Sequence, residues 1–117
     1  MLRRLFRQPS GTPGLTGKDR AIFEQLRGLG VDFTRPRHID HFFLLRNEEA
    51  ARGLAAHLPP PLETSVRQVS GIWSVQTSLV MPLSEEMIAS TRPNFEALAK
   101  RYGGSYDGWG AEADPPN

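Results

Sequence analysis

The feature that most restricts the fold is a ten-residue stretch, residues 72–81, in which the two sets of alternate side chains differ in character. Successive side chains of a β-strand point to opposite faces, so a period of two predicts a strand with one buried side. One face would carry Trp73, Val75, Thr77, Leu79 and Met81, and the other Ile72, Ser74, Gln76, Ser78 and Val80. Residues 63–70 alternate weakly, and Ser70-Gly71 suits a tight turn, so the two stretches together predict a hairpin.

Local signals predict the remaining elements. Residues 38–45 are rich in aromatic and branched side chains and too short for a helix, so we expect a strand, apolar on both faces in its second half. Apolar residues at helical spacing predict helices at about 18–29, 47–58 and 84–102, the first opened by a Thr16/Asp19 capping pair. Pro93 predicts a kink or break in the third helix near residues 91–92. A short strand over 105–110 ends the series.

After the first helix, the order of predicted elements is β-α-β-β-α-β. This order is typical of a ferredoxin-like fold, in which two helices cover one face of a four-stranded antiparallel sheet. In that topology the first and third strands lie in the middle, and these are the two most apolar strands here. The polar second strand and the glycine-rich fourth strand suit the edges. We therefore expect an α+β fold, a ferredoxin-like sandwich with an extra N-terminal helix.

Composition indicates one domain and a basic N-terminal arm. The 117 residues carry a net charge of +1, but residues 1–37 hold eight Lys/Arg against three Asp/Glu, and residues 38–117 hold six against ten. Residues 8–17 combine two prolines and three glycines, which opposes ordered packing. We expect a flexible basic arm at 1–17, a single ferredoxin-like regulator domain at 18–110 and a polar tail at 111–117.

The same composition excludes several classes of protein. The absence of cysteine excludes disulfides, thiolate zinc sites and a cysteine nucleophile. Without a long apolar window, neither a membrane span nor a secretory signal is expected, and the protein is predicted to be soluble and cytoplasmic. His38 and His41 lie three apart on a predicted strand, so they would face opposite ways and could not share a metal ion. No serine motif or phosphate-binding loop occurs, so we expect no catalytic, cofactor-binding or metal-binding residues.

The run from Tyr102 to Gly110 is the least generic part of the chain. Gly103-Gly104 is explained as a helix stop, because glycine readily adopts the left-handed conformation that ends helices. The string Tyr106-Asp107-Gly108-Trp109 then falls on a predicted edge strand. In a structural interpretation, Trp109 or Tyr106 packs under the third helix, and Asp107 ties down a turn by accepting backbone N–H groups. In a functional interpretation, Tyr106, Asp107 and Trp109 bind a partner, since exposed aromatics and unpaired strand edges favour association.

The ending Ala-Lys-Arg-Tyr-Gly-Gly-Ser-Tyr-Asp-Gly-Trp-Gly also resembles a known family. It follows a Met-Pro-Leu-Ser helix opening and an Arg-x-Arg-x-Ile-x-His-Phe strand, and together these resemble the family of the regulator of ribonuclease E activity B. The likeness spans about residues 18–110, and the Tyr-Asp-Gly-Trp-Gly string is its most specific part. The resemblance implies a ferredoxin-like, non-catalytic bacterial protein that binds a protein partner, the endoribonuclease, and inhibits RNA decay. The best-known member has acidic extensions at both ends, whereas this chain has a basic arm and only Glu112 and Asp114 after Gly110.

Two other functions remain as alternatives. Direct RNA binding could use the open sheet face and the basic N-terminal arm, as in other ferredoxin-like domains. The open positions of the third strand carry no aromatic and no basic residue, which argues against it. A small enzyme of unrecognised type is the other alternative, and no motif points to it. No cofactor is implied by any of the three.

Overall fold

The computed structural model describes residues 15–58 and 62–113; residues 1–14 of the arm expected at 1–17 and the last residues of the tail lie outside this range. The helices and strands occur where the sequence predicts them, within a few residues. Leu15, which precedes the first helix, is already buried in the core. The elements are α1 (Gly17–Gly28), β1 (Arg37–Leu45), α2 (Glu48–Ala56), β2 (Glu63–Val69), β3 (Ile72–Met81), α3 (Glu85–Arg101) and β4 (Ser105–Ala111).

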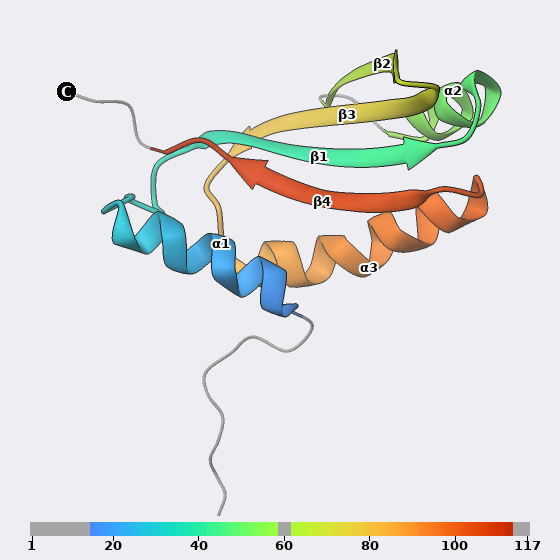
Figure 1. Ribbon diagram of the computed structural model, residues 1–117. Helices are drawn as coiled ribbons and strands as arrows, with labels where there is room; N and C mark the ends of the chain where they lie inside the picture. The colour runs from blue at the N-terminus through green and yellow to red at the C-terminus, as the bar shows by residue number, and fades with distance from the viewer. Residues whose placement is uncertain (1–14, 59–61, 114–117) are drawn as a thin grey trace, which may run out of the picture.

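The four strands form one antiparallel sheet in the order β2-β3-β1-β4. The apolar strands β1 and β3 are therefore central, and β2 and β4 are the edges, as the predicted topology requires. With three helices, this is the α+β, ferredoxin-like arrangement with an additional N-terminal helix (Figure 1). The fold prediction is confirmed.

All three helices pack on one face of the sheet, called the inner face below. In Figure 1, α1 and α3 run along the lower side of the sheet, and α2 lies behind its right-hand end. One part of the core joins α1, the start of α3 and the ends of β1 and β4, with Phe23, Ile39, Ile88 and Trp109 at its centre. The other part joins α2, the second half of α3 and the middle of the sheet, with Phe43, Leu54, Val75 and Ala99 at its centre.

Local chemistry explains where the elements begin. Thr16 and Asp19 form a capping box, in which each side chain accepts a hydrogen bond from the other residue's backbone N–H. Asn47 and Ser84 cap α2 and α3 in the simpler way, with one side-chain oxygen accepting from the first turn. The hairpin turns at Ser70 and Gly71, whose φ values of 53° and 80° match the type I′ turn that suits twisted strands.

The prediction of a break near residues 91–92 is wrong, because α3 continues through Pro93 as one helix, Glu85–Arg101. The alternative, a kink at this point, stays a prediction. An interior proline costs a helix about 3 kcal/mol through its missing N–H and its ring. Here the proline lies on the exposed side of α3, where water can solvate the backbone. Ile88 before it and Ala99 after it are both buried in the core. Packing of both halves onto the sheet thus keeps the helix continuous.

Candidate partner-binding surface

A β-bulge in β4 determines where the three predicted site residues point. In the register with β1, Trp109 pairs with His41 and Gly108 with Phe42, but Tyr106 pairs with Phe43, so one extra residue is accommodated at Asp107. Gly108 has a φ of +98°, which a residue with a side chain adopts only under strain. The bulge places both Tyr106 and Trp109 on the inner face, although side chains three residues apart on a regular strand would face opposite ways.

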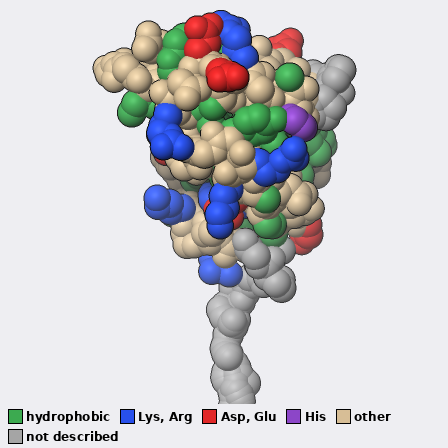
Figure 2. Space-filling view, turned by 90° about the vertical axis from the view of Figure 1, so that its right-hand side faces the viewer, with side chains coloured by type: hydrophobic (Ala, Val, Ile, Leu, Met, Phe, Trp, Pro, Cys, Tyr) green, Lys and Arg blue, Asp and Glu red, His purple; other side chains and the backbone are tan. Residues whose placement is uncertain are grey.

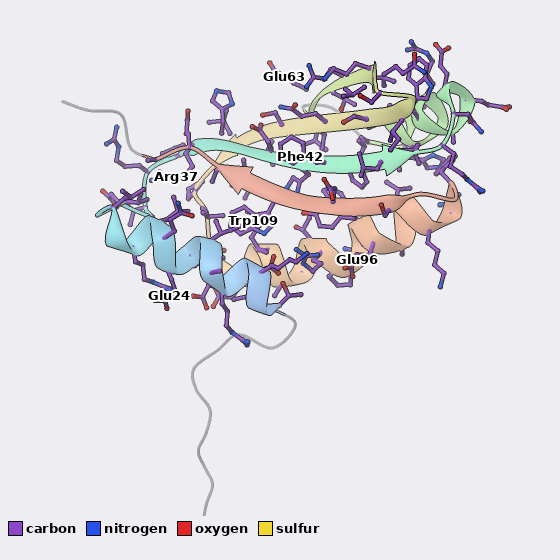
Figure 3. The ribbon with its side chains drawn as sticks, viewed as in Figure 1. Glu24, Arg37, Phe42, Glu63, Glu96 and Trp109 are labelled. Atoms are coloured by element: carbon purple, nitrogen blue, oxygen red, sulfur yellow. The ribbon has the colours of Figure 1, made fainter. Side chains whose placement is uncertain are left out.

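Trp109 is buried between the sheet and the helices, as Figure 3 shows, with 6% of its surface exposed. Its ring packs at 5.4 Å from that of Phe23, and its Nε1 donates a 2.9 Å hydrogen bond to Asp19 Oδ1. A side chain in this position offers almost no surface to a partner. Trp109 therefore joins the last strand to the first helix.

Asp19 is fully buried and accepts hydrogen bonds from three elements. Arg92 of α3 donates to it twice, at 2.9 and 2.6 Å, in addition to the bonds from Trp109 and from the Thr16 backbone. Burial alone would raise the pKa of Asp19. The hydrogen bonds from Arg92, Trp109 and Thr16, with the positive charge of Arg92, outweigh that effect and lower the pKa to about 2. Asp19 is thus a buried, negatively charged residue that connects α1 to Arg92 of α3 and Trp109 of β4, and these three residues are called the junction below.

Tyr106 is half-buried and continues this network toward β1. Its hydroxyl shares a 2.8 Å hydrogen bond with His41 Nδ1, and the Arg92 guanidinium lies 5.1 Å from its ring centroid. Burial raises the pKa of Tyr106. Burial also lowers the pKa of His41 to about 4; the charge of Arg92 acts in the same direction and that of Asp40 in the opposite one. At neutral pH this histidine is therefore an uncharged core residue.

Asp107 is the one member of the predicted trio that is exposed. In the described part of the chain, no hydrogen bond or ion pair joins its carboxylate to another residue. It lies in the bulge, on the edge strand, where its charge meets solvent. The sequence string thus separates into two core aromatics and one free surface charge.

The opposite face of the sheet, called the open face below, carries a set of apolar side chains that no described helix covers. Phe42 and Leu44 stand on its central strand β1 and are half-buried. Val69, Ile72 and Val80 are 50%, 49% and 54% exposed, and pairing registers place them on the same face. These are three of the four large apolar residues that stand out as exposed in the described chain. Val69 and Ile72 lie at the hairpin end of this face, near Leu44, whereas the row of Asp40 and Ser78 separates Val80 from them. Exposed apolar side chains of this kind mark interaction sites in globular proteins.

Polar groups lie between and around the apolar residues of the open face. Ser78 donates its hydroxyl to Asp40 across the sheet, and Glu63 lies in the same row on β2. Figure 3 shows Glu63 pointing away from the helices. Arg67 lies on the same face farther along β2. A shallow hollow of about 280 Å³ on this face is lined by His38, Glu63, Thr64, Ser65, Gln76 and Ser78.

The basic side chains gather elsewhere. Figure 2 views the end of the molecule at which α3 finishes, where Lys and Arg are spread over much of the surface and Asp and Glu lie mainly toward the top. The exposed Lys100 and Arg101 belong to the last turn of α3, where positive charge interacts favourably with the helix dipole. Helix stability therefore accounts for part of this charge.

The two strand histidines do not converge. His38 is exposed on the open face, and His41 is buried on the inner face, as their spacing predicts. Within residues 15–58 and 62–113, no three His, Asp or Glu side chains cluster in a way that could hold a metal ion. None of the helices in the same residues is long and apolar enough to cross a bilayer.

Comparison with known families gives a match over the whole folded region. Residues 17–111 match the family model described as regulator of ribonuclease activity B. The chain belongs to this family. A search of curated proteins finds no match. The matched range begins with α1 and ends with β4, so the regulator of ribonuclease activity B family includes the N-terminal helix as part of its common unit.

Two features of this family member were missed by sequence reasoning. The open-face side chains of β1 were within a correctly predicted strand, whose apolar character on both faces was the available signal. The junction of Asp19, Arg92 and Trp109 gave no local signal, because its members lie 73 and 90 residues apart along the chain. Only the capping role of Asp19 is visible in the sequence.

Proposed function

We propose that this protein is a non-catalytic regulator that binds a ribonuclease through the open face of its sheet and so modulates RNA degradation in the cytoplasm. The observation that carries the proposal is the apolar set on that face, left uncovered by the described helices. Membership of the regulator of ribonuclease activity B family supports a ribonuclease as the partner. Burying exposed aliphatic side chains supplies the free energy of association, at about 25 cal/mol per Å².

The trio on β4 contributes to this surface in two ways. Asp107 is a contact at the rim of the open face, beside Gly108, which pairs with Phe42. Tyr106 and Trp109 contribute from the inner face. Their hydrogen bonds to His41 and Asp19 hold β4 in its bulged register. An arrangement of this kind pre-forms the surface and reduces the entropy lost on binding.

The charges of the open face favour a protein over RNA. Asp40 and Glu63 lie on it with a single arginine, Arg67, and phosphate groups are repelled by carboxylates. Among the described residues, Phe42 is its one phenyl ring and His38 its one imidazole, whereas sheet faces that bind single-stranded RNA stack several bases on aromatic side chains. Ser78 donates its hydroxyl to Asp40, and a serine nucleophile would instead donate to a base such as histidine.

The test is an inhibition assay with purified ribonuclease E and a fluorescent single-stranded RNA. The wild-type protein should slow cleavage with a saturable dependence on its own concentration that does not change with the RNA concentration. The double variant Ile72→Gln/Val80→Gln removes two exposed apolar groups from the open face. We expect the half-maximal inhibitory concentration to rise about tenfold or more.

Leu29→Gln is the matched control, because Leu29 is also an exposed apolar residue, 64% exposed, but lies at the end of α1. This variant should inhibit like the wild type. Equal inhibition by the open-face double variant would refute the proposed surface. Direct, strongly salt-dependent RNA binding measured by fluorescence anisotropy, with inhibition relieved by excess RNA, would refute the proposed partner.

A further inference from the structure

The two edges of the sheet differ in their ability to pair with another strand. β4 is interrupted by the bulge at Asp107 and Gly108, and bulges are one of the devices that protect edges from pairing. β2 pairs with β3 over its whole length without a register shift. Its seven residues, ETSVRQV, contain no proline and no lysine, two of the residues that commonly protect an edge, and its two charged residues, Glu63 and Arg67, have opposite signs; all but Val66 are exposed. Within residues 15–58 and 62–113, the β2 edge is therefore the one available for pairing.

The hairpin turn determines which backbone groups of β2 face outward. In a two-residue hairpin the residues flanking the turn form a hydrogen-bonded pair, and such pairs alternate along the ladder. The flanking pair here is Val69 and Ile72, so every second residue back from Val69 directs its N–H and C=O toward β3. The backbone groups of Thr64, Val66 and Gln68 point instead to the outer edge. These residues can form hydrogen-bonded pairs with an added strand.

The charges of β2 are complementary to those of an identical strand running the other way. An antiparallel pairing centred on Ser65 places Thr64 opposite Val66 of the partner subunit, in hydrogen-bonded pairs that use the outward groups. The same register places Glu63 opposite Arg67 of the partner subunit, and two-fold symmetry creates this pair twice. Both lie on the open face, in non-hydrogen-bonded positions, where directly opposite side chains come closest and opposite charges stabilise.

The inner side of this edge can receive a second copy as well. A shallow groove of about 400 Å³ between α2 and β2 is lined by Arg52, Ala55, Ala56, Thr64 and Val66. The two alanines leave room beside the edge. In the symmetric pairing, Val66 of the partner subunit lies on the same side of the extended sheet, next to this groove. Apolar contact with the alanines would add to the backbone hydrogen bonds.

We propose that the protein forms a symmetric dimer in which β2 pairs with β2 of a second copy, with Glu63 opposite Arg67 of the partner subunit, to give a continuous eight-stranded sheet. The dimer leaves the open faces of both copies accessible. It therefore presents two equivalent surfaces to a partner, and dimerisation can be measured without any ribonuclease.

The test is sedimentation velocity of the full-length chain over a concentration series at low salt. The wild type should show a reversible monomer–dimer equilibrium. Glu63→Arg or Arg67→Glu alone turns both attractive pairs into repulsive ones, so we expect dimerisation at least about tenfold weaker. The double variant Glu63→Arg/Arg67→Glu restores opposite charges and should restore the dimer. An equimolar mixture of the two single variants should form a heterodimer, detectable by native mass spectrometry.

Glu24→Arg on α1 is the matched control, since it makes the same charge change on an exposed residue far from β2 (Figure 3). This variant should dimerise like the wild type, and circular dichroism should show every variant folded. A wild-type chain that stays monomeric throughout the series overturns the proposal. Undiminished dimers in both single variants, or no rescue by the double variant, overturn the proposed register.

Discussion

At the scale of single residues, the carboxylate of Asp19 connects α1 to both α3 and β4. Its two carboxylate oxygens accept four hydrogen bonds, from the backbone of Thr16, from Arg92 twice and from Trp109. Both partners of the ion pair are shielded from water, with side-chain exposures of 0% for Asp19 and 12% for Arg92. Breaking such a pair leaves an uncompensated charge in the core, which costs far more than loss of a surface pair.

The prediction for this residue is that Asp19→Asn lowers the free energy of unfolding by about 3–5 kcal/mol, because the Arg92 guanidinium loses its buried counter-charge. Urea unfolding followed by circular dichroism measures the change. Glu96→Gln removes the other carboxylate partner of Arg92, at 3.3 Å, but Glu96 is 53% exposed. Its effect should stay within about 1 kcal/mol. Similar losses in the two variants would show that burial does not determine the value of the Arg92 pairs.

At the scale of elements, the bulge in β4 converts an alternating strand into one that presents two aromatics to the same side. Gly108 makes this possible through its φ of +98°. A Cβ added at Gly108 would meet no atom within 4 Å, so only the backbone conformation opposes a side chain there. Gly110, two residues on, is equally open but has no positive φ. Substituting alanine at Gly108 and at Gly110 therefore compares a position with backbone strain to one without it, and neither position is crowded.

We predict that Gly108→Ala lowers the free energy of unfolding by about 1–3 kcal/mol, since alanine is strained at this φ. Gly110→Ala should change it by less than about 0.5 kcal/mol. Thermal and urea unfolding of both variants provide the measurement. If the two substitutions cost the same, the bulge does not depend on the conformational freedom of glycine.

The elements themselves were predictable because their signals are local. The capping pair before α1, the type I′ turn at Ser70-Gly71 and the period of two in β3 each lie within ten residues of sequence. The bulge was not predictable in this way. A regular alternation through residues 105–111 puts Tyr106 and Trp109 on opposite faces, and only pairing with β1 shows the extra residue. The continuity of α3 through Pro93 likewise depends on packing that local rules do not describe.

At the scale of the whole molecule, the candidate site was only partly predictable. Strand order follows from the relative hydrophobicity of the strands, so the location of β4 at an edge was foreseen. Burial of Trp109 depends on α1 folding back over that edge, a contact between the two ends of the chain. The open face follows from the placement of all three helices on the other side, which no single segment encodes.

Stability of the whole fold should fall in mild acid because of His41. Its pKa is lowered from 6.5 to about 4 in the folded state, so between these values the unfolded chain binds a proton that the folded chain excludes. The stabilisation is complete above pH 6.5 and is lost as the pH falls to about 4, a loss of about 3 kcal/mol. Below pH 4, protonation of Asp19 adds to the loss, since its pKa is lowered from 3.8 to about 2.

Urea unfolding at a series of pH values tests this prediction. His41→Gln removes the titrating group, so the decline between pH 6.5 and 4 should become shallower in this variant. His57→Gln makes the same substitution at an exposed histidine outside this network and serves as the control for the substitution itself. Parallel profiles for wild type and His41→Gln would show that another group causes the acid sensitivity.

The junction between Asp19 and Trp109 also has a consequence for synthesis on the ribosome. The two residues are 90 positions apart, so at about 5–20 residues per second the carboxylate is made roughly 5–20 s before its indole partner. During that interval α1 has its cap but neither Arg92 nor the last strand to bury against. The first helix of the chain is therefore the last to form its tertiary contacts. The nascent protein reaches its final fold only when its C-terminal strand has left the exit tunnel.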